Sequence, residues 1–234
     1  MRSPFVRGMA HGIPIALGYL SVSFGFGILA VRAGLPAAAA VGISVTNLTS
    51  AGQAAGLQII AAGGTLLEMA LTQLVINIRY ALMGFSLSQK LDGSFTTPRR
   101  LLVSYGITDE IYAVAVSQPG LLTASYMYGL ILTPMLGWTL GTALGAAAGE
   151  LLPAAVTDAM GIVLYGMFLA IILPPSRRDK HVLMVVGLAA GCSCLFRYGL
   201  TAVSEGFAVI LSALAAAVAG ALLFPVEDGG EVSA

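Results

Sequence analysis

Residues 12–31 read GIPIALGYLSVSFGFGILAV, twenty residues without a charged side chain. At about 1.5 Å per helical residue, this stretch forms a helix of about 30 Å, the thickness of the hydrocarbon core of a membrane. It is too long for a cleaved signal peptide, whose apolar region has about 7–15 residues. The whole chain of 234 residues has the same character, because 58% of its residues are hydrophobic and 9% are charged. The sequence therefore predicts an all-α polytopic membrane protein.

Eight apolar segments follow one another along the chain. They are residues 12–31, 37–62, 65–88, 100–117, 124–148, 154–173, 182–199 and 203–224. Six of them are predicted to be ordinary spans. The segment 37–62 is interrupted by polar residues and glycines, which membranes tolerate only where the backbone lines a cavity or is buried in protein. The segment 154–173 is short and lies between Pro153 and Pro174. We predict that these two segments are broken or re-entrant helices.

Basic residues predict the orientation, since cytoplasmic loops are enriched in Lys and Arg. They cluster in three places: Arg2 and Arg7; Lys90, Arg99 and Arg100; and Arg177, Arg178 and Lys180. All three clusters lie on one side only if both unusual segments leave the membrane on the side from which they enter. The pattern predicts about six crossings and two termini in the cytoplasm.

Internal similarity indicates an inverted repeat, an arrangement found in many transporter folds. The matching stretches are 35–38 with 152–155, Arg79-Tyr80 with Arg197-Tyr198, and 109–114 with 204–209. We expect a single membrane domain, 1–234, with repeat halves 12–117 and 124–224. Arg79 and Glu110 are 31 residues apart but Arg197 and Glu205 are 8 apart, which leaves coincidence open for one of these two matches.

Two apolar segments carry ionised side chains that lipid-facing helices avoid. Arg79, two residues after the polar Asn77, lies in 65–88, and Asp109 and Glu110 lie in 100–117. A charge at membrane depth is costly, so it is by default a functional-site hypothesis. We expect Arg79 either to contact a ligand carboxylate or to pair with Asp109 or Glu110. A permanent pair that only fixes helix packing is the alternative.

The polar interruption of 37–62 is predicted to form a third wall of the same cavity. Its candidate binding residues are Asn47, Ser50, Gly52 and Gln53. A glycine there permits close approach of the backbone to a ligand. Asn77 and Arg79 are expected to face this cavity as well.

Other residues have a structural explanation beside the functional one. Asp158 follows Pro153 and would interact favourably with a helix N-terminus, and Arg197 and Glu205 flank a short turn, where an interfacial ion pair explains them. Glu68 is expected to reach the membrane interface. The remaining two groups are Gly141, Gly145 and Gly149, whose spacing predicts a close-packing helix face, and Cys192 and Cys194, which we expect to be buried thiols.

In their order along the chain, these motifs resemble the AzlC family of branched-chain amino-acid permeases, named for azaleucine resistance. The resemblance covers most of the chain. It rests on Gly25-Phe26-Gly27, Ser50-Ala51-Gly52-Gln53, Asn77-Ile78-Arg79-Tyr80, Thr108-Asp109-Glu110, and the run from Gly137 through Gly149 to Pro153. The chain departs from the family at 49–54, where flanking aromatic residues are expected and Thr49 and Ala54 stand instead.

The resemblance implies the large subunit of a secondary transporter in a bacterial inner membrane. It implies a small, AzlD-type membrane subunit as partner and export of branched-chain amino acids, sometimes methionine. Such a substrate needs a cation or a helix N-terminus for its carboxylate, an acid or carbonyls for its ammonium, and an apolar pocket for its side chain. An acid that alternates between Arg79 and a proton would provide proton coupling.

The sequence offers little support for other classes of function. The chain contains no His-Glu-x-x-His, Cys-x-x-Cys or Gly-x4-Gly-Lys-Ser/Thr motif, so we expect no enzyme, catalytic residue, metal site or cofactor. Eleven basic and eleven acidic residues cancel, so we expect no nucleic-acid partner. A passive channel-like pore stays open as an alternative, since broken helices also build filters, and so does a structural membrane subunit.

Overall fold

The computed structural model describes residues 3–151, 153, 166, 169, 172–200 and 202–225. These residues are mainly helical, and among them the only strand-like pairing is an isolated bridge between Leu91 and Leu122. The predicted all-α fold class is therefore confirmed. Most of the segment 154–173, including Asp158, lies outside the described residues, so its predicted break stays a prediction.

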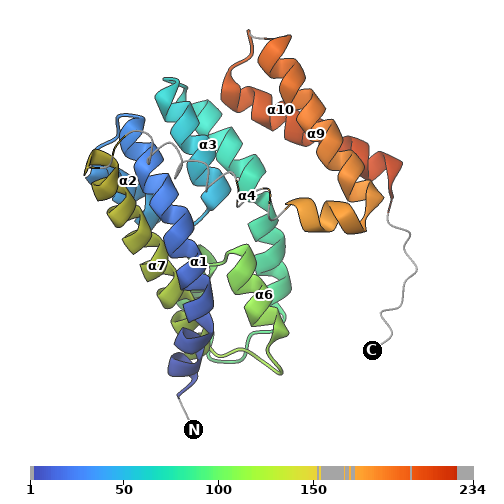
Figure 1. Cartoon of the computed structure of the whole chain (residues 1–234). Helices are drawn as coiled ribbons and strands as arrows, with labels where there is room; N and C mark the ends of the chain where they lie inside the picture. The colour runs from blue at the N-terminus through green and yellow to red at the C-terminus, as the bar shows by residue number, and fades with distance from the viewer. Residues whose placement is uncertain are drawn as a thin grey trace. The chain divides into compact units, whose positions relative to one another are not determined.

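The helices follow the predicted segments closely (Figure 1). They are α1 (Pro4–Arg32), α2 (Ala37–Thr46), α3 (Ser50–Ala61), α4 (Leu66–Ser88), α5 (Thr97–Tyr105), α6 (Asp109–Ser117), α7 (Ala124–Leu151), α9 (Lys180–Tyr198) and α10 (Glu205–Leu223). Within the described part of the chain, five helices are long and apolar enough to cross a membrane: α1, α4, α7, α9 and α10.

The chain folds into two compact units. The first contains Met1–Leu57 and Ile76–Tyr165, and the second contains Gln58–Val75 and Gly166–Ala234. Both α3 and α4 therefore contribute residues to each unit. The proposed repeat halves, 12–117 and 124–224, stay a prediction.

In the first unit, α1 and α7 lie side by side and approach each other through glycines (Figure 1). A Cβ at Gly27 would collide with the backbone at Thr142, and one at Gly145 would collide with the backbone of Phe24. Gly141 and Gly149 face α1 in the same way. In a membrane, small residues let two helices pack backbone to backbone. The predicted packing role of the glycine series on α7 is confirmed.

The predicted break in 37–62 is also confirmed. Here α2 ends at Thr46 and α3 begins at Ser50, while Asn47 is extended with φ −144° and ψ 103°. With 10 and 12 residues, each helix is too short to cross a membrane alone. Three non-helical residues thus separate two short apolar helices.

The segment 100–117 does not form the continuous span that we expected from its composition. It consists of the nine-residue helices α5 and α6, separated by residues 106–108. Gly106 caps the end of α5, and the Thr108 hydroxyl accepts a hydrogen bond from the backbone N–H of Ile111 at 3.4 Å. Such an N-cap begins a new helix and competes with continuation of the preceding one. The first unit therefore contains two broken helices.

The second unit contains α9, packed against α10, and no described residue of α9 is buried in it. Cys192 is half-buried and Cys194 is exposed, so the expectation of buried thiols is wrong, although both are free. Large apolar side chains are exposed on other helices as well, such as Leu82 on α4 and Leu222 on α10.

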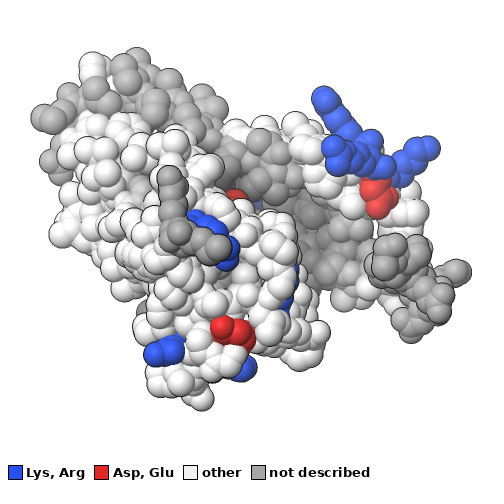
Figure 2. Space-filling model, turned by 90° about the horizontal axis from the view of Figure 1, so that it is seen from below, with Lys and Arg blue, Asp and Glu red and all other residues white. Residues whose placement is uncertain are grey.

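Charged side chains are sparse on the surface. Figure 2 shows one face on which uncharged residues dominate and the charges occur in a few small groups. A surface with so many exposed apolar residues is typical of a protein that is covered by lipid or by another membrane protein. The chain is thus a helical, polytopic membrane protein.

Candidate functional site

Both helix breaks of the first unit line one cavity of about 190 Å³. The first break contributes residues 46–49, the second contributes Ser104, Tyr105 and Ile107, and α4 contributes Asn77 and Tyr80. Segments that are about 30 to 60 residues apart in the sequence therefore meet at one place. Residues from all three of the segments that the sequence analysis named line this cavity, and the binding roles assigned to them stay a prediction.

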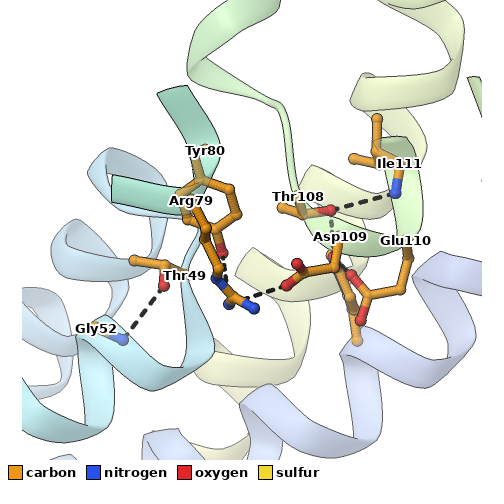
Figure 3. Close-up of polar contacts among 9 residues, drawn as sticks. Thr49, Gly52, Arg79, Tyr80, Thr108, Asp109, Glu110 and Ile111 are labelled. Atoms are coloured by element: carbon orange, nitrogen blue, oxygen red, sulfur yellow. Dashed lines mark hydrogen bonds and ion pairs between the residues drawn. The ribbon is translucent and has the colours of Figure 1, made fainter. Parts of the chain in front are cut away.

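Side chains satisfy the backbone groups that the first break releases. In a continuous helix, the carbonyls of Val45 and Asn47 would accept hydrogen bonds from residues four positions later. Here Val45 accepts from the Tyr105 hydroxyl, and Asn47 accepts from the side-chain amide of Gln53. The hydroxyl of Thr49 accepts from the N–H of Gly52 at 3.2 Å, which caps the start of α3 (Figure 3). This arrangement lets irregular backbone exist at membrane depth.

Gln53 is buried, with 2% of its surface exposed, and it is bonded on both ends of its amide. Its Oε1 accepts from Nε1 of Trp138 at 3.3 Å and from the Ser44 hydroxyl at 3.5 Å. The Ser44 hydroxyl also lies 2.7 Å from that of Thr142. Gln53 is therefore not among the cavity-lining residues; it holds the Asn47 carbonyl and ties the break to α7.

Arg79 is paired with Asp109 across the gap between α4 and α6 (Figure 3). Arg79 Nη2 lies 2.9 Å from Asp109 Oδ2. It also donates to the Tyr80 hydroxyl at 3.3 Å, and the guanidinium lies 5.0 Å from the centre of the Tyr80 ring. Both partners of the ion pair remain about 40% exposed, with side-chain exposures of 43% and 38%. The pair is therefore accessible, and Arg79 contacts Tyr80, which lines the cavity.

Glu110 has a different partner from its neighbour Asp109. The Tyr19 hydroxyl donates to Glu110 Oε2 at 2.5 Å and lies 2.6 Å from the hydroxyl of Thr108. Successive helical residues point about 100° apart, so the two carboxylates face different helices. The sequence left the partner of Arg79 open between them, and in the structure it is Asp109.

The Tyr19 ring continues this network towards the first break. It packs edge-on against Trp138, with ring centres 5.1 Å apart. Trp138 in turn donates to Gln53. The start of α6 and the start of α3 are thus both held to the close-packed pair of α1 and α7.

The other predicted residues lie in several places. Asn47 and Asn77 line the cavity, whereas Ser50 and Gly52 lie in the first turn of α3, next to it. Arg197 lines a separate cavity of about 670 Å³ in the second unit. Glu205 is the first residue of α10, but its side chain lies outside the described part of the structure.

Glu68 does not reach the interface as we expected. It is buried in the second unit, with 4% of its surface exposed. Its carboxylate accepts from the Ser204 hydroxyl at 2.5 Å and from the N–H of Gly206 at 2.8 Å. Negative charge is favourable at a helix N-terminus. Glu68 therefore joins α4 to the start of α10.

Sequence reasoning missed several residues of the site. Tyr105 and Tyr80 line the cavity, and Tyr19 binds Glu110, yet none of them was selected. One signal was available for the second break, because a threonine followed by two acidic residues, as in Thr108-Asp109-Glu110, is a typical helix start. No comparable signal identified Tyr19, since its partner is 91 residues away.

The family is decided by a match that covers this site. The family model described as AzlC protein matches residues 14–152, more than half of the chain. This chain belongs to the AzlC family. The matched region runs from α1 to α7 and includes both breaks, Arg79 and Asp109.

Relatives of this AzlC-family chain are named as membrane proteins. It is 29% identical over 197 residues to the inner membrane protein YgaZ of Escherichia coli (strain K12), and the match covers 80% of each chain. It is 29% identical over 221 residues to an uncharacterized membrane protein of Archaeoglobus fulgidus, covering 94% of this chain and 93% of that one. It is 25% identical over 200 residues to one of Helicobacter pylori (strain J99), covering 83% and 86%. No solved structure matches the chain.

Proposed function

We propose that this AzlC-family chain is the large subunit of a proton-coupled secondary transporter that exports branched-chain or other aliphatic amino acids across the inner membrane. One observation carries the proposal: two broken helices and the polar stretch of α4 meet at one small cavity. Irregular backbone that lines a cavity near membrane depth is the usual form of a binding site in transporters.

The size and lining of the cavity suit an aliphatic amino acid. Its volume of about 190 Å³ lies below the roughly 300–1,000 Å³ of drug-sized pockets, so it accepts a small solute. Asn47, Thr49 and Asn77 offer polar groups, while Leu48 and Ile107 offer apolar surface. A molecule with a charged head and a short aliphatic side chain matches both.

Arg79 is the proposed partner of the substrate carboxylate. It donates to Tyr80, which lines the cavity, and it is paired with Asp109. A substrate carboxylate would compete with Asp109 for the guanidinium, and the released Asp109 would take up a proton. This exchange links substrate binding to protonation. Glu110 supports the same mechanism by holding α6 to Tyr19.

We further propose a small AzlD-type subunit as partner, a cytoplasmic location for both termini, and no enzymatic activity. The exposed apolar residues of α9, such as Leu183 and Leu195, give such a subunit a surface on which to pack. The test is co-expression: leucine export should require both proteins. Export by this chain alone would contradict the two-subunit assembly.

Transport itself is tested by counterflow in proteoliposomes that contain both subunits. Labelled leucine should accumulate transiently in vesicles preloaded with unlabelled leucine, and the initial rate should saturate. A linear, non-exchanging flux would instead indicate a passive pore, for which the two broken helices at one cavity are the supporting feature.

Substitutions then test the assigned roles. Arg79→Ala should reduce counterflow at least about hundredfold, because a charge-assisted carboxylate contact made in the bound state is lost. Asp109→Asn should retain exchange but lose the response to an imposed pH gradient. Arg99→Ala is the matched control, since Arg99 is exposed and donates to the Ser94 carbonyl outside the cavity. Normal counterflow in Arg79→Ala would show that the site assignment is wrong.

A further inference from the structure

The proposed site leaves one chemical question open, namely which group takes the substrate's ammonium. None of the residues that line the cavity has a carboxylate. The two acids beside it, Asp109 and Glu110, are bound to Arg79 and Tyr19. The remaining acceptors are the side-chain oxygens of lining residues such as Asn47 and Asn77 and the backbone carbonyls around the first break.

Among these acceptors we select the Val45 carbonyl, because Val45 directly precedes the lining residues 46–49 and its carbonyl contacts the lining residue Tyr105. It lies in the last turn of α2, where the helix dipole places partial negative charge. Cations are stabilised at such a helix end. The Asn47 carbonyl is less suitable, because the buried amide of Gln53 already holds it and is itself fixed by Trp138.

In the structure, a neutral donor binds the Val45 carbonyl. The Tyr105 hydroxyl from the end of α5 donates to it across the two breaks. Tyr105 lines the cavity and is 41% exposed, so its side chain has room to move away. An ammonium would form a charge-assisted hydrogen bond with the same carbonyl, roughly twice as strong as a neutral one.

We propose that the Tyr105 hydroxyl holds the place of the substrate's ammonium on the Val45 carbonyl and yields it only to solutes that carry an amino group. Tyr105 is then a specificity-determining residue. The inference rests on the proposed transport function and assigns the amino-group end of its site. Arg79 and Tyr105 would then act on the two charged groups of one zwitterion: the carboxylate would replace Asp109 on Arg79, and the ammonium would replace the Tyr105 hydroxyl on the Val45 carbonyl.

The test uses two analogues of leucine as inhibitors of leucine counterflow: isoamylamine, which lacks the carboxylate, and isocaproate, which lacks the amino group. Tyr105→Phe keeps the ring and removes the competing hydroxyl. The half-inhibitory concentration of isoamylamine should fall about fivefold, the factor for a net hydrogen bond of about 1 kcal/mol. That of isocaproate should stay unchanged.

Tyr112→Phe is the matched control. It removes a tyrosine hydroxyl from α6 that lies 2.9 Å from the Ser86 hydroxyl and does not line the cavity. The half-inhibitory concentrations of both analogues should be unchanged in this variant. If Tyr105→Phe does not accumulate in membranes, Tyr105→Met removes the same hydroxyl with a side chain that adapts to irregular space, and the same shift is expected.

The outcomes separate this inference from the proposed function. Equal shifts for both analogues, or no shift for isoamylamine, would overturn the role of Tyr105 while leucine transport stands. Absence of saturable leucine counterflow in the unchanged protein would overturn the proposed function, and this inference with it.

Discussion

Backbone hydrogen-bonding groups are satisfied in different ways at the contact of α1 with α7 and at the two broken helices. Between α1 and α7, glycines bring two continuous helices so close that a Cβ at Gly27 or Gly145 would meet backbone. At the two breaks, backbone hydrogen bonds are given up, and side chains such as Gln53 and Tyr105 replace them. The contact of α1 with α7 is formed by close backbone packing, whereas the two breaks depend on a few polar side chains.

The difference separates close packing of helices from the exposure of backbone polar groups. Continuous helices satisfy their own backbone groups, so their contact offers nothing for a solute to bind. A broken helix offers carbonyl and N–H groups, but it holds its shape only if neighbours satisfy those groups when no ligand is present. Trp138 and Thr142 on α7 supply part of that support.

The largest effect on stability is expected at the glycine contact. Gly145→Ala should destabilise the protein by about 3 kcal/mol, the upper part of the range for overpacking, because the new methyl group meets the backbone of Phe24. Thermal unfolding in detergent measures it. Gly18→Ala is the matched control, since nothing lies within 4 Å of a Cβ there. Equal stability of the two variants would contradict close packing of α1 and α7.

A smaller effect is expected at the first break. Gln53→Leu should cost about 2 kcal/mol and reduce leucine counterflow, because the Asn47 carbonyl and the Trp138 N–H lose their partner. Gln58→Leu on the same helix α3 is the control, since Gln58 is exposed. Unchanged counterflow in Gln53→Leu would show that the break does not depend on this amide.

The smallest effect is expected at the second break. Thr108→Ala removes the cap of α6 and the neighbour of the Tyr19 hydroxyl, and it should cost about 1 kcal/mol. Unfolding in denaturant measures it. Thr46→Ala is the comparison, because its hydroxyl bonds within its own helix to the Gly42 carbonyl. A greater loss in Thr46→Ala would contradict a capping role for Thr108.

Much of this architecture could be predicted from local pattern. The break after Thr46 follows from polar residues in an apolar run, and the glycine series on α7 follows from four-residue spacing. The division of 100–117 was missed because its apolar composition is that of an ordinary span. The role of Gln53 was misjudged for another reason: a polar residue at a break contacts either ligand or backbone, and only its neighbours decide which.

By itself, the sequence determined the class of the protein and its AzlC character, because hydropathy and motif order are local properties of the chain. Only the tertiary structure decided that both breaks share one cavity, that Asp109 rather than Glu110 binds Arg79, and that Tyr105 covers the Val45 carbonyl. The reason is physical. Pairings between side chains 30 to 91 residues apart depend on which helix faces meet, and that follows from packing rather than from spacing along the chain.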